Sequence, residues 1–331
     1  MKRVFIEQIE SYFPANKICN SWVEEKIIAG GFPIQHGLLE KMIGCETRYY
    51  ADAQEQVSDL AVRAAEKLMQ QIPGRRIDLL IFAAASADLI EPATANIIQQ
   101  KLNLQCPCFD LKNACNSVTN AIEIATALLL QNAYQNILIV SGEKTSDSVN
   151  YNNLQKEMMK DHFAAYSFGD AGVALLLSTT EDDKGFFYQK HQSFGKHWPL
   201  CRIEGGGSMF PKDATKLVFS GDTFGLKNVI YKIAPPFVKE CIEEAGLSVN
   251  DIQHICTHQV SRETYNMVAE TLEYDVNRIV QTFHLFGNTA ATSVPIAFEY
   301  AMKNGRIKKG DVVLLLGMAA GINISVQLMK A

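Results

Sequence analysis

Residues 110–130, which read DLKNACNSVTNAIEIATALLL, decide the fold of this 331-residue chain. The pattern predicts that a short strand ends near Phe109 and that an almost wholly apolar helix begins around Cys115. A helix without a broad polar face is a buried one, and the alanines of this helix are small enough for close packing. We therefore expect a central, buried helix that carries a cysteine at its N-terminus.

A cysteine at that position has a physical reason to be reactive. The unpaired backbone N–H groups and the macrodipole of a helix N-terminus favour an anion, so the pKa of the Cys115 thiol is expected to fall toward neutral pH. The alternative is an inert core cysteine that packs as a small apolar residue.

The composition excludes several classes of protein. With 47% hydrophobic residues and a net charge of −5, the chain can bury a large core and has no basic stripe for nucleic acid or an anionic membrane. It has no run of about 18 uncharged apolar residues, so no membrane span is expected, and its first residues do not resemble a signal peptide. The eight cysteines have neither framework nor metal-site spacing, which predicts free thiols, no metal site and a cytoplasmic protein.

Strands and helices alternate along most of the chain. The predicted strands cover residues 4–9, 79–84, 106–109, 136–141, 173–177, 252–257 and 312–316. The predicted helices cover residues 57–71, 91–102, 115–130, 236–245 and 291–303, and the fourth has Pro236 at its tolerated first position. Residues 44–48 are expected to form a polar loop. Such alternation predicts parallel sheets that are covered on both faces.

The second half of the chain repeats the spacing of the first. Asp78 and Asp251 each precede a predicted strand. Cys115 follows Asp78 by 115 − 78 = 37 positions, and Asn288 follows Asp251 by 288 − 251 = 37 positions. Asn288 is therefore expected to occupy in the second half the place that Cys115 holds in the first.

An internal duplication of this kind predicts the architecture. We expect an α/β protein with two fused halves, residues 1–178 and 179–331, stacked as α/β/α/β/α layers around shared buried helices. Ligand chemistry in such sheets gathers at the carboxyl ends of strands. The residues at or just beyond those ends are Cys115, His258, Asn288 and the turn of residues 317–321.

Five short motifs follow one another along the chain. They are Asn113-Ala-Cys115, Phe168-Gly-Asp-Ala-Gly172, Thr257-His-Gln259, Phe286-Gly-Asn-Thr289 and the closing Gly317-Met-Ala-Ala-Gly321. Each is weak alone, but together, in this order and spacing, they resemble the thiolase superfamily over nearly the whole chain. The resemblance is to its β-ketoacyl-acyl-carrier-protein synthase III branch.

This resemblance implies a reaction and a set of site residues. A homodimeric thiolase-fold acyltransferase would load an acyl group onto Cys115 and then form a carbon–carbon bond with a second acyl thioester by Claisen condensation. The backbone N–H groups of Cys115 and Ala320 would form an oxyanion hole, and His258 and Asn288 would donate hydrogen bonds to the carbonyl of the second thioester. For that role the other ring nitrogen of His258 needs a partner. The substrates would be coenzyme A or acyl-carrier-protein thioesters, and no cofactor is expected.

The same residues also have structural interpretations. His258 could be a buried histidine with satisfied hydrogen bonds, and Asn288 could belong to an ordinary turn. Gly169 and Gly172 are interpreted as tight-turn glycines, and Asp170 as structural support. The joint pattern favours the catalytic interpretation of the first two residues.

Glu91 bears on which reaction is catalysed. In chain-initiating synthases of this branch the matching position usually carries an apolar residue that floors the acyl pocket of the partner subunit. The segment Glu91-Pro-Ala-Thr94 resembles instead the Glu-Pro pattern of enzymes that condense two acyl chains head to head, as in olefin, pyrone and dialkylresorcinol pathways. That resemblance implies a base that removes a proton from the α-carbon. The alternative is a favourable charge at a helix start.

Departures from the branch pattern also favour a specialised reaction. Ser261 stands where the branch has an asparagine that helps to hold pantetheine, and the Trp and Arg that grip the coenzyme A adenine cannot be located. We lean toward condensation of two acyl chains in specialised lipid or polyketide biosynthesis. The alternatives are a decarboxylating synthase III of fatty acid initiation, an acyltransferase to an alcohol or amine, and a non-catalytic partner of an active paralogue. An intact Asn288 counts against the acyltransferase.

Overall fold

A computed structural model of the chain describes residues 2–152 and 161–331. The strands are β1 Arg3–Tyr12, β2 Asn16–Cys19, β3 Thr47–Tyr50, β4 Leu79–Ala83, β5 Cys108–Leu111, β6 Ile137–Glu143, β7 Ala171–Thr180, β8 Gly185–Ser193, β9 Cys201–Ile203, β10 Phe219–Gly221, β11 His254–Thr257, β12 Val312–Ala319 and β13 Asn323–Lys330. The helices are α1 Asn20–Ala29, α2 Leu38–Ile43, α3 Val57–Gln71, α4 Thr94–Lys101, α5 Ser117–Leu130, α7 Thr223–Glu244, α8 Arg262–Leu272, α9 Phe283–Phe286 and α10 Ser293–Lys303. A 3-10 turn, η7 Ala290–Thr292, leads directly into α10.

The main sheet contains the predicted duplication. Its strand order is β11-β12-β13-β8-β1-β7-β6-β4-β5, and its halves meet between β8 and β1 through the pair Val4–Phe186. Outward from that junction, β1-β7-β6-β4 and β8-β13-β12-β11 follow the same succession of two antiparallel pairs and one parallel pair. Beyond them, β5 lies parallel to β4, and a single parallel bridge joins Ile255 to Ile279. The boundary predicted at residue 178 falls near the end of β7, and the division of the chain there stays a prediction.

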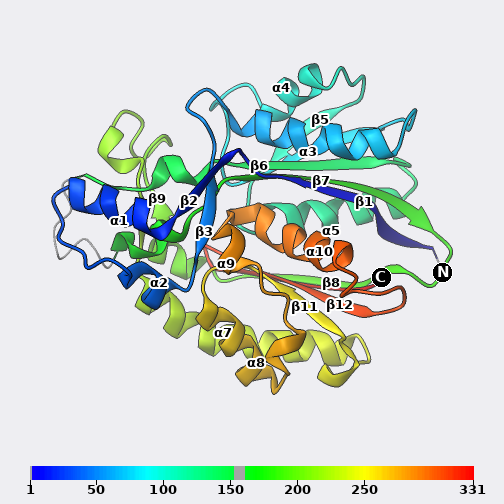
Figure 1. The fold of residues 1–331 in the computed structure, drawn as a ribbon. Helices are drawn as coiled ribbons and strands as arrows, with labels where there is room; N and C mark the ends of the chain where they lie inside the picture. Colours follow the sequence, from blue (N-terminus) through cyan, green and yellow to red (C-terminus); the bar gives the residue numbers. More distant parts are fainter. Residues whose placement is uncertain (1, 153–160) are drawn as a thin grey trace.

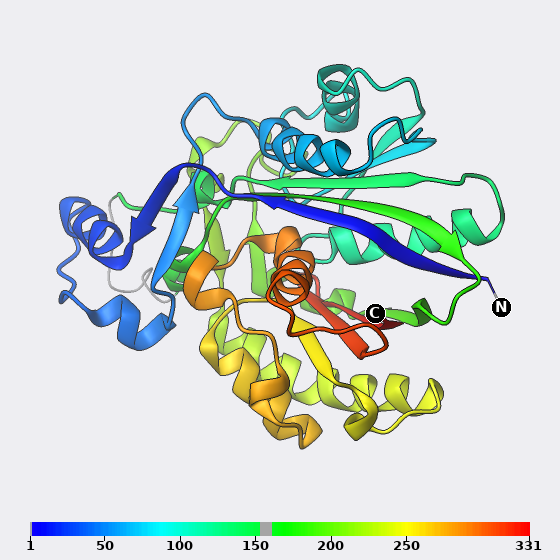
Figure 2. The same cartoon turned by 45° about the vertical axis from the view of Figure 1, so that its right-hand side comes forward.

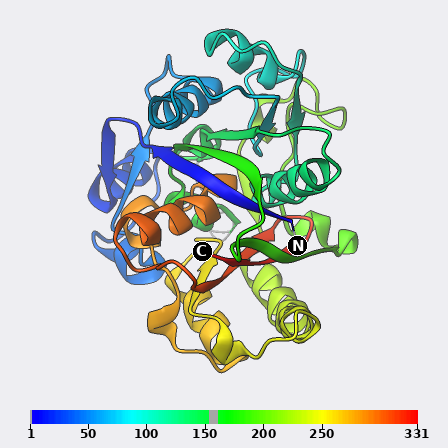
Figure 3. The same ribbon diagram turned by 90° about the vertical axis from the view of Figure 1, so that its right-hand side faces the viewer.

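Figure 1 shows the five layers of the fold. Helices α3 and α4 cover the outer face of the first half-sheet, α5 and α10 lie between the two half-sheets, and α7 and α8 cover the outer face of the second. The same succession is visible from the other two directions (Figures 2 and 3). The shared core between the half-sheets contains buried residues of α5 such as Ala121 and Ala125 together with Val294 and Ala297 of α10. The predicted central helix and the α/β/α/β/α architecture are confirmed.

The expected parallel pairing is confirmed only between β4 and its neighbours β5 and β6 and between β11 and β12. β7 runs antiparallel to β6, and β13 runs antiparallel to β12. Parallel neighbours need a crossover connection, whereas antiparallel strands can be joined directly. β12 and β13 are joined by a turn of residues 320–322, so the last strand of each half returns beside the strand before it.

Two local expectations are also corrected. Helix α7 begins at Thr223, so Pro236 lies inside it together with Pro235 instead of at its first position. The carbonyl groups that lose helical donors to these prolines belong to the exposed residues Tyr231 and Lys232, where water can replace the donor. Of the polar loop predicted at residues 44–48, residues 44–46 are irregular as expected, but Thr47 and Arg48 belong to strand β3 and Arg48 is completely buried.

Among residues 2–152 and 161–331, no helix is both long enough and apolar enough to cross a membrane.

Candidate active site

A sharp turn presents Cys115 just before the central helix. Ala114 has a left-handed backbone with φ +47°, and Asn116 is the N-cap residue of α5. The Ser117 hydroxyl donates to Ala114 O at 2.7 Å and accepts from Asn113 N at 2.8 Å. Cys115 therefore lies one residue before the helix cap, on a turn that its neighbours hold rigid.

The predicted fall in the pKa of Cys115 is contradicted. Burial raises the pKa of the thiol above its ordinary value, and the neighbouring Cys201 and Glu143 act in the same direction. The Cys115 backbone N–H opposes this rise. The structure therefore favours a protonated thiol before substrate enters, because apolar surroundings penalise the thiolate.

His258 follows strand β11 and is buried, with 4% of its surface exposed. Its Nδ1 lies 2.6 Å from the hydroxyl of Ser293, the first residue of α10. Burial lowers the pKa of the imidazole to about 4, so the ring is neutral at neutral pH. When the Ser293 hydroxyl donates to Nδ1, the proton of the ring sits on Nε2, as a hydrogen-bond donor to substrate requires. Ser293 thus supplies the partner that the sequence could not identify.

The end of strand β12 connects Cys115 and His258. The His258 backbone N–H donates to Leu316 O at 3.0 Å. The next residue, Gly317, lies against Asn116, since a Cβ on Gly317 would come within 2.4 Å of Asn116 Oδ1. Two consecutive residues of β12 therefore contact His258 and Asn116, the neighbour of Cys115. This brings the two predicted site residues together.

Asn288 is held by a short ladder between two Phe-Gly motifs. The Asn288 N–H donates to Ser167 O at 2.9 Å, and the Gly169 N–H donates to Asn288 O at 3.1 Å. The Asn288 Oδ1 accepts from Ala290 N at 3.0 Å, which leaves the Nδ2 group able to donate. The start of α10 after this segment also carries Ser293, the partner of His258, so the structure groups Asn288 with the other two site residues.

The glycines of the motif Phe168-Gly-Asp-Ala-Gly172 are not the tight-turn glycines that were expected. Neither has a left-handed backbone. A Cβ on Gly169 would lie 2.3 Å from Phe286 O, and one on Gly172 would lie 2.0 Å from Leu60 O. They are needed because another backbone passes very close. The Asp170 carboxylate accepts from Ala51 N at 2.8 Å and Ser146 N at 2.9 Å, in agreement with a structural role.

Gly169→Ala is expected to lower the free energy of unfolding by about 1–3 kcal/mol, because the new methyl group must push away the backbone carbonyl of Phe286, the last residue of α9. Thermal unfolding measures this loss. Gly195→Ala is the matched control, since nothing lies within 4 Å of a Cβ there and its backbone is not left-handed. Equal melting temperatures for the two variants would contradict the close approach.

Backbone conformation corrects the expected match between Cys115 and Asn288. The left-handed residue before each buried helix is Ala114 in the first half and Ala290 in the second, with φ +47° and +48°. These two residues are 290 − 114 = 176 positions apart, whereas Asn288 follows Cys115 by 288 − 115 = 173. The counterpart of Cys115 is therefore Ala291, and Asn288 lies three positions earlier. The motif spacing could not detect this offset, because Asp78 directly precedes β4 whereas Asp251 lies three positions before β11 begins at His254.

Glu143 is a site residue that the sequence interpretation missed. This completely buried carboxylate ends β6 and accepts from Ala85 N at 2.7 Å, Ser86 N at 3.2 Å and Ser86 Oγ at 2.7 Å, and also from Ala291 N. It therefore joins the loop that leads to Glu91 with the start of α10. The available signal was a charged residue at the end of an otherwise apolar strand.

Glu143 gives the stability of the protein a predicted pH dependence. Because burial raises the pKa of its carboxyl from 4.5 to about 7, the folded state binds this proton more tightly than the unfolded chain. The contribution of Glu143 to the free energy of unfolding is therefore expected to fall as the pH rises from about 4.5 to 7 and to level off above. Glu143→Gln should remove this slope. Melting temperatures of both proteins across that range test it, and parallel slopes would contradict the assignment.

Glu91 lies on the surface, three residues before helix α4 begins at Thr94. The N-terminus of α4 is instead bound by Asp110, which accepts from Thr94 N at 2.8 Å and Ala95 N at 2.7 Å. The first turn of α4 contains no acidic residue, so the helix-start interpretation of Glu91 is wrong. None of the contacts among the described residues joins Glu91 to Cys115, His258 or Asn288 within one chain.

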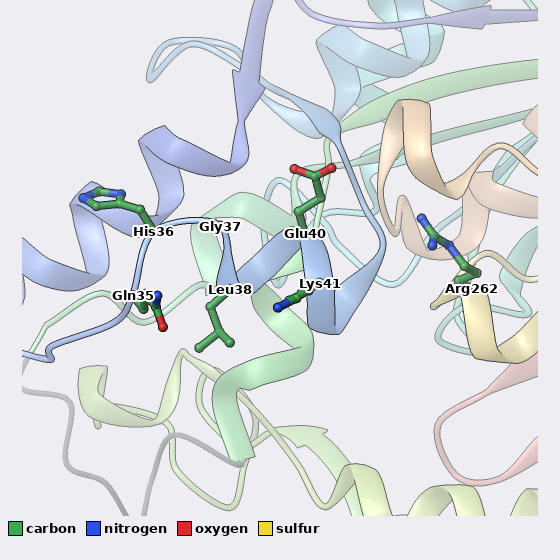
Figure 4. Close-up of a pocket in the computed structure, with 7 residues that line it drawn as sticks. All are labelled: Gln35, His36, Gly37, Leu38, Glu40, Lys41 and Arg262. Atoms are coloured by element: carbon green, nitrogen blue, oxygen red, sulfur yellow. The ribbon is translucent and has the colours of Figure 1, made fainter.

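A polar cleft lies beside Arg262, at the start of α8. It has a volume of about 460 Å³ and is lined by residues 35–41 without Leu39 and by Arg262. Figure 4 shows Lys41 and its neighbours on one side and Arg262 on the other. Lys41 and Arg262 are two permanent cations that could bind an anionic group there, although the carboxylate of Glu40 also lines the cleft.

Comparison with known proteins assigns the family. A family model for 3-oxoacyl-[acyl-carrier-protein] synthase III matches residues 109–194, and the model for the C-terminal part of such synthases matches residues 242–331. A β-ketoacyl-[acyl-carrier-protein] synthase III of Neisseria meningitidis serogroup A is 30% identical over 315 residues, which cover 94% of each protein. This chain belongs to the β-ketoacyl-[acyl-carrier-protein] synthase III family. It is therefore an acyltransferase that condenses acyl thioesters.

Solved structures agree with this assignment. Cerulenin-bound OleA of Xanthomonas campestris has a TM-score of 0.89 and 25% identity over 99% of this synthase III-like chain and 97% of the OleA chain. The 3-oxoacyl-[acyl-carrier-protein] synthase III of Aquifex aeolicus VF5, at 22% identity, has a TM-score of 0.86 with both chains fully covered. The latter likeness shows the thiolase fold alone.

Proposed function

We propose that Cys115 is the nucleophile and that His258 and Asn288 serve the condensation step. The Cys115 sulfur attacks the carbonyl of an acyl thioester, the carrier thiol leaves with a proton, and the acyl group stays on Cys115. The grouping of Cys115 with His258 around the end of β12 is the observation that carries this proposal. The backbone N–H groups of Cys115 and Ala320 donate to the oxyanion that forms during acyl transfer.

The second step needs a carbon nucleophile. His258 Nε2 and Asn288 Nδ2 donate to the carbonyl of the second thioester and stabilise its enolate, whose α-carbon then attacks the acyl group on Cys115. The Ser293 hydroxyl lies against Nδ1 of His258, and the Ala290 N–H donates to Oδ1 of Asn288. Both contacts support the donor roles, because they leave Nε2 of His258 and Nδ2 of Asn288 able to donate to the substrate.

Glu91 is the base that removes the α-proton, and it acts in the site of the partner subunit of a homodimer. The surroundings of Glu91 favour an interface. The apolar side chains of Leu89 and Ile90 are 51% and 90% exposed, and Phe109, on the edge strand β5, is 37% exposed. Exposed apolar side chains beside an unpaired strand edge are typical of surfaces that become covered. The reaction is then a non-decarboxylating condensation of two acyl chains in specialised lipid or polyketide biosynthesis.

The acyl donors are coenzyme A or acyl-carrier-protein thioesters, and no further cofactor takes part. Arg262 and Lys41 in the polar cleft at the start of α8 supply charge for the phosphate of either carrier. A cytoplasmic location stays a prediction; all eight cysteines are free thiols in the structure.

Product identification tests this function. The purified protein is incubated with a panel of acyl thioesters, each offered on coenzyme A and on a carrier protein, with and without a malonyl donor. Products that contain two acyl chains and form without a malonyl donor support the proposal. Strict dependence on malonyl-carrier with release of carbon dioxide would instead support fatty acid initiation, which the synthase III relatives favour as the second candidate.

A further inference from the structure

The side chain of Asn323 holds the turn between β12 and β13. Its Nδ2 donates to Ala320 O at 3.0 Å, and its Oδ1 accepts from Ser193 Oγ at 2.6 Å. A Cβ on Gly321 would lie 2.6 Å from the Asn323 Nδ2, so the amide packs directly against the backbone of the turn. Both ends of the amide are therefore used, and the position of Ala320 is fixed from within its own loop.

The same residue reaches the nucleophile turn in the other half of the chain. Asn116 Nδ2 donates to the backbone carbonyl of Asn323 at 3.1 Å. Asn116 is completely buried and directly follows Cys115. Asn323 thus lies between the backbone of Cys115 and the backbone of Ala320 and is bonded to the immediate surroundings of each.

We propose that Asn323 is a positioning residue that sets the spacing between the two backbone N–H groups of the oxyanion hole. This inference rests on the proposed function, because it takes Cys115 and Ala320 as the donors. Such donors are effective only when they are fixed in advance at the position where negative charge develops. A turn of residues 320–322 that lost the side-chain clamp would sample other orientations of the Ala320 peptide.

The sheet itself does not need this side chain. Asn323 is paired with Ala319 in β12 and with Ser193 in β8 through backbone positions that any residue can occupy. Removing the amide should therefore leave the strands in place and loosen only the turn. This separates a positioning role from a general contribution to folding.

The test compares two reactions of the same sulfur. Acylation of Cys115 by an acyl thioester develops an oxyanion, whereas alkylation by iodoacetamide does not. Asn323→Ala is expected to slow acyl loading about ten-fold, part of the loss typical for a missing oxyanion donor, with alkylation unchanged. Asn323→Asp has nearly the same shape and keeps an acceptor for Ser193 Oγ but loses the donor to Ala320, so it should slow loading similarly.

Ser193→Ala is the control from the same cluster, because it keeps the contacts of Asn323 to Ala320 and Asn116 and should load acyl groups at close to the normal rate. Normal loading by both Asn323 variants would overturn this inference and leave the proposed function intact. Equal slowing of acylation and alkylation would also overturn it, since that result means a displaced Cys115. A wild-type protein that never loads an acyl group would instead refute the proposed function, and the inference with it. If Asn323→Ala does not fold, Asn323→Asp carries the same comparison.

Discussion

Cys115→Ala is expected to abolish covalent acyl loading completely and to reduce product formation by about 10³-fold or more, as removal of a catalytic nucleophile typically does. No other side chain in the grouped site can replace the sulfur, since His258 is committed to Ser293 and Asn288 has only an amide. Intact-mass measurement after incubation with an acyl thioester shows the loading directly, as the increment of one acyl group.

Cys201→Ala is the appropriate control for that experiment. Cys201 interacts electrostatically with Cys115 and so lies close to it, which makes it a candidate for adventitious acylation. Its removal should leave the acyl increment unchanged. An increment that survives Cys115→Ala, on Cys201 or elsewhere, would remove Cys115 from the mechanism.

The residues that the sequence predicted are those whose signal is local. The turn at Cys115 and the helix after it form one continuous apolar pattern, and the structure places α5 two residues from its predicted start. Four of the five motifs were informative because each lies at one end of a strand, where the duplicated fold gathers side chains. The motif of residues 286–289 lies instead between α9 and η7, hydrogen-bonded to the motif that precedes β7. Local patterns could not predict the direction of β7 and β13, because strand direction depends on how the chain returns and not on which residues it contains.

The residues that the sequence did not predict act through distant partners. Ser293 is 35 positions from His258, Glu143 is 57 positions from Ser86, and Asn323 is 207 positions from Asn116. Serine, glutamate and asparagine are common at such places for unrelated reasons, so their roles emerge only when the two halves of the fold are brought together. Gly169 is similar: its lack of a side chain is explained by Phe286, which lies more than a hundred positions away.

Glu91→Gln is expected to leave acyl loading on Cys115 intact while it lowers condensation by about 10²–10⁴-fold, the usual contribution of a general base. Glutamine has the same shape but cannot accept the α-proton. Glu91 is exposed within its own chain and does not bind the N-terminus of α4, so the substitution should leave the fold of each subunit intact. Glu270→Gln, a change of another exposed glutamate in α8, is the matched control and should retain full condensation. Unchanged product formation by Glu91→Gln would remove Glu91 from the chemistry.

A mixing experiment tests whether Glu91 acts in the neighbouring subunit. In the proposed homodimer, Cys115→Ala removes the proposed nucleophile and Glu91→Gln removes the proposed base, so neither variant is expected to be active in condensation on its own. In a mixed dimer, one of the two sites combines an intact Cys115 with an intact Glu91 from the partner, and activity should return after subunit exchange. If Glu91 serves Cys115 of its own chain, no site in the mixed dimer is complete and activity stays absent. Mixing wild-type-like Glu270→Gln with a Cys115→Ala/Glu91→Gln double variant is the complementary test. No site in that mixed dimer has both groups when the base comes from the partner, so activity should fall as subunits exchange, whereas a base acting within its own chain would leave it unchanged.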